Sequence, residues 1–252
     1  MAQWRGRADM MARSDAYSIA YEDYIKALKM DPTDEAALKA FTRVALLTNR
    51  AQDALSWVKS LTMEKTSVQA QVSISKLLAA AGFRSDAIDA VAKACSIEPV
   101  AAAACEQLAS LQADAGDATQ LDAALGSLRR AAPDSAPTAY YTGVLAFLKG
   151  DANGALEAAR RAVGIDASFA AAYDLIGAAH TKLGQADLAA QAFQTSLRFD
   201  PHDSTAYANL GLLALAAGRR DEARNYFAEA LWLRPDDKTA LDGMAKTRTH
   251  AS

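Results

Sequence analysis

Glycine returns along this chain at a fixed interval of 34 residues, and proline follows the same interval. The two series are Gly82, Gly116, Gly150, Gly184 and Gly218, and Pro99, Pro133, Pro201 and Pro235. Ala167 stands where the one missing proline would lie. A period of this length indicates a stack of repeated supersecondary units, each burying its apolar face on its neighbours, rather than one globular core.

The recurring proline divides the chain into seven units and a predicted helical tail at 238–252. The units are residues 1–34, 35–67, 68–101, 102–135, 136–169, 170–203 and 204–237. The last unit shows the apolar pattern most clearly, with one set spaced 3, 1 and 3 residues apart and a second set spaced 4 and 3 apart. These sets are Tyr207, Leu210, Gly211 and Ala214, then Ala223, Phe227 and Ala230. Each spacing places its residues on one face of a helix, so each unit is predicted to be two antiparallel helices.

The recurring glycine lies between the two predicted helices of its unit. A helix commonly ends in a left-handed residue, a conformation that glycine adopts at the lowest cost. Asn49 and Asp15 take the glycine position in the first two units, and they are the residue types next most tolerant of it. The residue before proline avoids the helical region, so second helices should end at Asp31, Asp200 and Arg234. Aspartates such as Asp34, Asp203 and Asp237 then serve as N-caps of the next helix.

This pattern resembles the tetratricopeptide repeat, most specifically over residues 170–237. The resemblance implies an all-α protein, a right-handed α-solenoid superhelix of antiparallel helix pairs formed as one domain over residues 1–252. It also implies that the first helices line a concave groove and that the tail is a capping helix. Proteins of this family commonly bind other proteins, so the expected partner is another protein or a peptide segment.

Composition excludes several other classes of function. The chain has 27 basic and 30 acidic residues, a balance that argues against nucleic acid as a partner. No apolar run approaches the roughly 18 residues needed for membrane insertion. The N-terminus lacks the apolar core of a secretory signal, which favours a cytoplasmic location. No HExxH, GxSxG or phosphate-loop pattern occurs, so we predict no catalytic residue, no metal site and no cofactor.

The two cysteines, Cys95 and Cys105, fall where other repeats carry buried residues such as Leu231 and Tyr207. No CxxC pattern or nearby histidine pair accompanies them, which argues against a metal site. The favoured interpretation is that both are small buried hydrophobic residues. A disulfide between successive helices is the alternative.

A second stripe on the first helices, which the resemblance assigns to the groove, holds the candidate site. The candidate peptide-binding residues are Arg5, Lys39, Arg43, Gln69, Lys76, Tyr140, Val144, Phe147, Asp174 and Asn209. The basic members form either an electropositive groove for an acidic peptide or a solvated face. The aromatic members form either an apolar anchor for a peptide or packing between repeats. Lys39 matches a lysine with which some family members clamp a peptide carboxylate, but Arg43 replaces their asparagine. A looser binder of acidic segments is therefore expected.

These observations predict an adaptor that binds a partner segment in its groove. Two alternatives stay open. One is a scaffold that forms a homo-oligomer or joins several subunits through its edges and convex face. The other is the repeat segment of a larger enzyme, such as a transferase, whose catalytic domain lies outside this chain.

Overall fold

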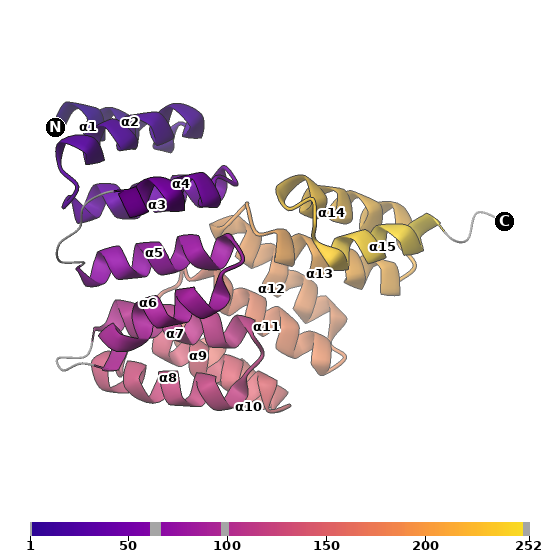
Figure 1. The fold of residues 1–252 in the computed structure, drawn as a ribbon. Coiled ribbons are helices and arrows are strands. Elements are labelled where there is room, and N and C mark those ends of the chain that lie inside the picture. Colours follow the sequence, from indigo (N-terminus) through magenta and orange to yellow (C-terminus); the bar gives the residue numbers. More distant parts are fainter. Residues whose placement is uncertain (1, 61–66, 97–100, 249–252) are drawn as a thin grey trace. The chain divides into compact units, whose positions relative to one another are not determined.

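A computed structural model describes residues 2–60, 67–96 and 101–248, and their regular secondary structure is entirely α-helical. The chain separates into two compact units, residues 1–133 and 134–252, which we describe one at a time (Figure 1). The helices of the N-terminal unit are α1 (Ala2–Arg13), α2 (Tyr17–Met30), α3 (Glu35–Leu47), α4 (Ala51–Ser60), α5 (Val68–Ala80), α6 (Arg84–Ser96), α7 (Ala102–Asp114) and α8 (Ala118–Ala131). The helices of the C-terminal unit are α9 (Ala136–Leu148), α10 (Ala152–Ile165), α11 (Ala170–Lys182), α12 (Ala186–Phe199), α13 (Ser204–Ala216), α14 (Arg220–Leu233) and α15 (Lys238–Arg248).

Consecutive helices pack in pairs within each unit. In the N-terminal unit α1 packs on α2, α5 on α6 and α7 on α8, and the first helices α3, α5 and α7 also contact one another in order. In the C-terminal unit α9 packs on α10, α11 on α12 and α13 on α14, while α15 contacts both α13 and α14 (Figure 1). The prediction of an all-α stack of helix pairs is therefore confirmed.

The turns between paired helices have the backbone conformation that the sequence predicts. The five recurring glycines have positive φ, and so do Asn49 at 54° and Asp15 at 57°. The predicted N-caps are also present: Asp34 accepts a hydrogen bond from the amide of Ala37, and Asp203 accepts from the amide of Thr205. Short-range backbone chemistry therefore sets both the reversal within a pair and the start of the next pair.

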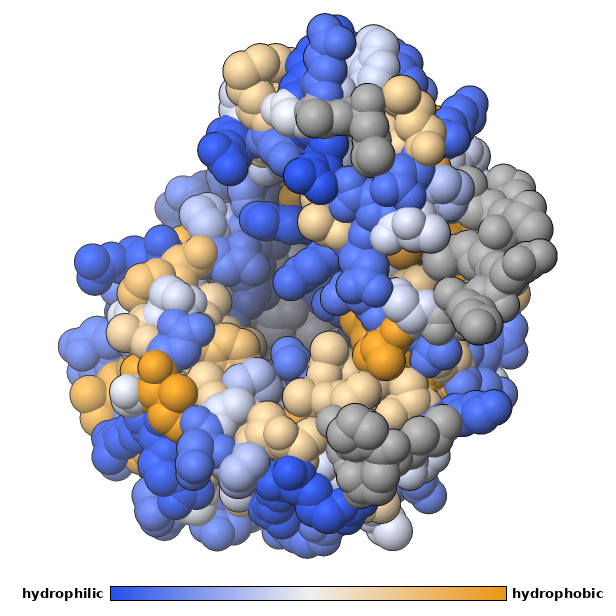
Figure 2. All heavy atoms as spheres, turned by 90° about the vertical axis from the view of Figure 1, so that its left-hand side faces the viewer, coloured by the Kyte–Doolittle hydropathy of each residue, from blue (hydrophilic) through white to orange (hydrophobic). Residues whose placement is uncertain are grey.

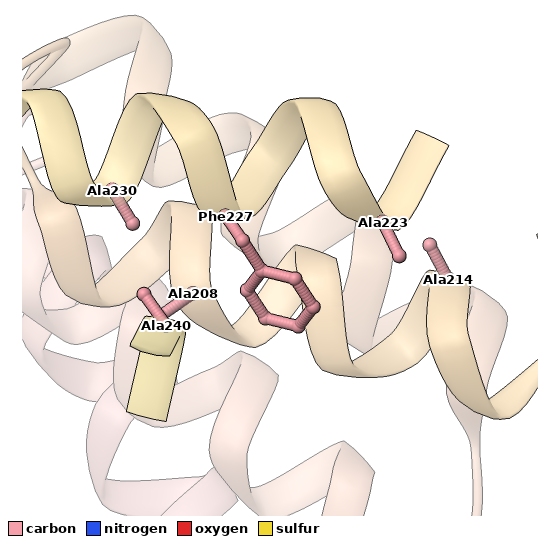
Figure 3. Close-up of a cluster of buried hydrophobic side chains, with 6 residues drawn as sticks. All are labelled: Ala208, Ala214, Ala223, Phe227, Ala230 and Ala240. Carbon is pink, nitrogen blue, oxygen red and sulfur yellow. The ribbon is translucent and has the colours of Figure 1, made fainter. Parts of the chain in front are cut away.

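The core at the end of the C-terminal unit is built around one phenylalanine. The Phe227 ring, fully buried on α14, lies among small side chains from α13, α14 and α15 (Figure 3). These side chains are Ala208, Ala214, Ala223, Ala230 and Ala240. A Cβ added to Gly211 would lie 2.5 Å from the ring, and one added to Gly243 of α15 would also overlap it. Glycine at these positions lets the neighbouring helices close over the aromatic ring.

The core of the N-terminal unit contains a group of aromatic rings and a buried charged residue. Phe41 lies with its ring centroid 4.9 Å from that of Tyr21 and 5.2 Å from that of Trp57. Asp23 is fully buried on α2, where it accepts hydrogen bonds from Arg7 at 2.5 and 2.8 Å and from Lys26 at 3.3 Å. These cations lower the pKa of Asp23 against the opposing effect of burial, the largest single influence on it.

The two cysteines are buried, as predicted, but their favoured interpretation as unlinked hydrophobic residues is wrong. A disulfide joins Cys95 of α6 to Cys105 of α7, with the Cα atoms 4.8 Å apart. That separation falls within the range a disulfide can bridge. Both residues are almost fully inaccessible to solvent. The packing of α6 on α7 brings the cysteines together, and their sequence spacing alone does not reveal this.

Candidate functional site

The first helices α3 and α5 border a pocket of about 550 Å³ in the N-terminal unit. Its lining consists of Ala36, Lys39, Ala40, Thr42, Arg43, Leu46, Leu47, Gln69, Ser73 and Lys76. Four of the ten predicted site residues are therefore brought together here. Lys39 and Arg43 are four residues apart on α3, so they lie on one helical face, and Gln69 and Lys76 occupy the corresponding face of α5.

The pocket combines cationic groups with an apolar lining. Lys39, Arg43 and Lys76 are all exposed, and none of them forms an ion pair with a carboxylate of the described residues. Alanine and leucine side chains of α3 supply the apolar surface between these cations. The Gln69 side-chain amide donates to Ser73 Oγ at 3.3 Å, so that amide is already oriented within α5. This arrangement suits a ligand that carries both negative charge and an apolar group.

Glu106 adds an acidic group beside these cations, and the sequence analysis did not identify it. It lies on α7, which packs next to α5, and its side chain is exposed. Partial desolvation by the surrounding protein raises the pKa of Glu106, and the charges of Lys76 and Lys39 oppose that shift. Glu106 occupies the same position in its unit as Lys39 does in the second unit. The alignment of the repeats is therefore the sequence feature that could have placed Glu106 near these cations.

A second pocket of about 500 Å³ is bordered by α1, α2 and α3. It shares Ala40, Arg43 and Leu47 with the first pocket and adds Asp9, Ala12, Arg13, Asp15, Tyr17, Tyr24 and Val44. The Tyr24 hydroxyl donates to Asp9 at 2.6 Å, and the Tyr17 hydroxyl donates to Asp15 at 2.5 Å. Both acidic and basic side chains line this pocket, whereas the charged side chains that line the first pocket are all cationic.

Arg5 is placed differently from the other basic candidates. Its guanidinium forms an ion pair with Asp34 at 2.8 Å, and it lines neither pocket. Asp34 also caps α3. The structure therefore assigns Arg5 a contact between α1 and the start of α3.

The aromatic candidates lie in the C-terminal unit, where they are half-buried. Tyr140, Val144 and Phe147 of α9 pack against a buried cluster of Ala155, Leu156, Ala159, Leu175 and Ala179. The Tyr140 ring also contacts the rings of Tyr141 at 4.9 Å and Phe169 at 5.3 Å between centroids. These contacts agree with the packing interpretation of the aromatic group.

The two polar candidates of the C-terminal unit occupy separate helices. Asn209 is half-buried on α13. Asp174 of α11 lies beside Asp203, and burial together with this second carboxyl raises the pKa of Asp174 to about 9. The neutral form of Asp174 is therefore favoured at neutral pH beside Asp203, the N-cap of α13, and the buried Asp174 Oδ1 has no hydrogen-bond partner among the described residues.

Two other kinds of site are absent from residues 2–60, 67–96 and 101–248. No group of three or more His, Cys, Asp or Glu side chains in these ranges is arranged to hold a metal ion. No helix within them has the length and apolarity needed to cross a membrane. Figure 2 shows a face on which hydrophilic side chains prevail and hydrophobic ones are interspersed. The pocket between α3 and α5 is therefore the strongest candidate site.

Comparison with known proteins agrees with the repeat architecture. The family model of the tetratricopeptide repeat matches residues 170–203 and 204–237. The chain is similar to the crystal structure of a tetratricopeptide repeat protein from Parabacteroides merdae, with a TM-score of 0.71, 12% identity and 97% of each chain covered. It is also similar to a thermophilic tetratricopeptide-repeat protein of Thermus thermophilus, with a TM-score of 0.62, 21% identity, and coverage of 72% of this chain and 98% of that chain. A search of curated proteins found no match. At these identities the two structures establish the fold.

Proposed function

We propose that this chain, a tetratricopeptide-repeat protein by its fold and by its matched repeats at 170–237, binds an acidic segment of a partner protein in the pocket between α3 and α5. Tetratricopeptide repeats in general form protein-interaction or scaffold modules. One observation carries the finer proposal: Lys39, Arg43 and Lys76 surround one pocket, and none of them is paired with a described carboxylate.

Charge complementarity supports an acidic ligand. The chain as a whole has a formal net charge of −3. The three exposed cations around one pocket therefore form a local charge of the opposite sign. A local patch of one sign raises the concentration of oppositely charged ligands and speeds their association. The cations come from two helices whose packing fixes their spacing, so the receptor loses little conformational freedom on binding.

The apolar part of the pocket lining further restricts the class of ligand that would fit. Leu46 and Leu47 are exposed at the end of α3, close in sequence to Arg43, and the pocket volume can hold a side chain of the ligand. An acidic segment with one apolar residue near its carboxylates would bury that residue against these leucines. Burial of a leucine-sized side chain contributes about 1.5–3 kcal/mol in favourable cases.

A peptide-display selection on the full chain tests this function. We expect enrichment of acidic sequences that contain an apolar residue. Replacing Lys39, Arg43 and Lys76 together by glutamate should weaken the enriched peptide at least tenfold, about 1.4 kcal/mol. The matched control replaces Lys29, Lys93 and Lys238, three exposed lysines that line neither pocket, by glutamate.

Two results would overturn the proposal. One is a selection that enriches no acidic motif, and the other is an equal loss of affinity in both charge-reversal variants. If light scattering then showed a mass that rises with protein concentration, a self-assembling scaffold would become the better explanation.

A further inference from the structure

The carboxylate of Glu106 is placed to act on the same cations that the proposed ligand would use. Helices α3, α5 and α7 lie side by side in the N-terminal unit (Figure 1). Glu106 is on α7, and both Lys76 of α5 and Lys39 of α3 influence it electrostatically. Its side chain is exposed, and Glu106 occupies the same position in its repeat unit as Lys39 does in the second unit, so both lie on the same face of the first helices.

Glu106 and the two lysines interact electrostatically without direct contact between their charged groups. No ion pair joins the Glu106 carboxylate to either lysine. The surrounding protein disfavours ionisation of this carboxyl by more than the lysines favour it. When ionised, the Glu106 carboxylate lowers the positive potential at the pocket without forming an ion pair that would hold the lysine side chains in place.

We propose that Glu106 is an internal competitor of the acidic ligand, a specificity-determining residue that reduces the affinity of the pocket for negative charge. This inference rests on the proposed function. Each carboxylate of the ligand is attracted by three cations and repelled by Glu106. Removal of that repulsion should therefore increase affinity more for a ligand with many carboxylates than for a ligand with few.

The test measures the affinities of synthetic peptides for the full-length chain. The peptides share one leucine-containing sequence and carry zero, two or four glutamates, the others being replaced by glutamine. For Glu106→Gln we expect roughly two- to fivefold tighter binding of the four-glutamate peptide, the range typical of an exposed charge pair. The gain should be smaller for two glutamates and absent for none.

Two further variants separate charge from structure. Asp89→Asn removes one exposed carboxylate from α6 of the same unit, and it should leave all three affinities unchanged. Glu106→Asp keeps the charge and should bind the peptides as the unaltered chain does. A gain in Glu106→Asp equal to that in Glu106→Gln would overturn the proposal, because the effect would then come from side-chain size.

The outcomes distinguish this inference from the function on which it rests. If the unaltered chain binds the four-glutamate peptide and Glu106→Gln binds it equally or more weakly, the role of Glu106 is refuted and the proposed function stands. An equal gain for all three peptides also refutes that role. If neither protein binds any peptide of the series, both proposals are refuted.

Discussion

The two compact units of this chain use the same helix pairs but stabilise them differently. In the C-terminal unit one motif recurs: the Phe193 ring lies against Gly177, and the Phe227 ring lies against Gly211. The N-terminal unit has no such pair among its described residues. It contains instead a disulfide, in addition to aromatic contacts around Phe41 and the buried Asp23.

The difference separates the residues that specify the fold from those proposed to bind. The repeats matched by the family model, at 170–203 and 204–237, lie entirely in the C-terminal unit. Both pockets described above lie in the N-terminal unit, which contains no match to the family model. A match to the repeat pattern therefore identifies packing positions. It carries no information about the face of the first helices, where ligand specificity would be set.

The largest effect is expected from the aromatic core of the C-terminal unit. Phe227→Ala should lower the free energy of unfolding by about 3–5 kcal/mol, because it leaves a cavity where the helices close over the ring. Urea denaturation followed by circular dichroism measures this loss. Phe199→Ala is the control, since that ring is nearly half exposed, and it should cost much less. Equal costs would show that the phenylalanine–glycine contact is not what stabilises this unit.

The second-largest loss of stability is expected in the N-terminal unit, on removal of its disulfide. Replacing Cys95 and Cys105 by serine should destabilise it by about 2–3 kcal/mol, because the cross-link restricts the unfolded chain. Hydrogen exchange should localise the loss to α6 and α7. Alkylation of the denatured, unreduced protein supplies the direct check, since two reactive thiols would show that the disulfide is absent. Disulfides persist mainly in oxidising compartments, so this check on protein from its native source also bears on the predicted cytoplasmic location.

Asp174 should make the stability of the C-terminal unit depend on pH. Its pKa in the folded state, about 9, lies above its ordinary value of 3.8. The folded state therefore binds this proton more tightly, and the resulting stability is fully present below pH 3.8 and is lost as pH rises to about 9. Asp174→Asn cannot ionise, so it should be more stable than the unaltered chain at pH 8, by more than about 1.4 kcal/mol, the equivalent of one pKa unit.

The measurement for Asp174 is the midpoint of thermal unfolding from pH 4 to pH 9. The difference between Asp174→Asn and the unaltered chain should grow steadily with pH. Asp187→Asn, which removes an exposed carboxylate from α12, is the control and should show no such trend. Parallel curves for Asp174→Asn and the unaltered chain would contradict the raised pKa of Asp174.

The smallest effect is expected at Arg5. Its ion pair with Asp34 is largely exposed on the arginine side, so Arg5→Ala should cost less than about 1 kcal/mol of stability. It should also leave the affinity for an acidic peptide unchanged, since Arg5 lines neither pocket. Titration of the peptide into Arg5→Ala and Lys39→Ala side by side compares the two positions. A similar loss in both would place Arg5 in the binding site after all.

Much of the fold could be predicted from the sequence because its signals are local. The left-handed residues, from Asp15 to Gly218, follow from backbone conformational preference alone. The caps at Asp34 and Asp203 follow from the chemistry of a single turn. Residues on one helical face can likewise be grouped by spacing, and Lys39, Arg43, Gln69 and Lys76, which the spacing groups, line one pocket.

The remaining features depend on contacts between elements. The disulfide requires the spacing of α6 and α7, and ten residues of sequence separation do not define it. Arg5 is on the predicted stripe, but its long side chain reaches Asp34 instead of a pocket. Glu106 lies on a third helix, outside the lining of the pocket, so its influence on Lys39 and Lys76 emerges only when α3, α5 and α7 are placed together.

The central claim is that binding specificity lies in the irregular N-terminal repeats. The most direct test is a hydrogen-exchange footprint of the full chain with and without a saturating four-glutamate peptide. We expect added protection in α3 and α5, around Lys39 and Lys76, and none in α9. Protection confined to α9, around Tyr140 and Phe147, would contradict the account and place binding on the aromatic face of the C-terminal unit.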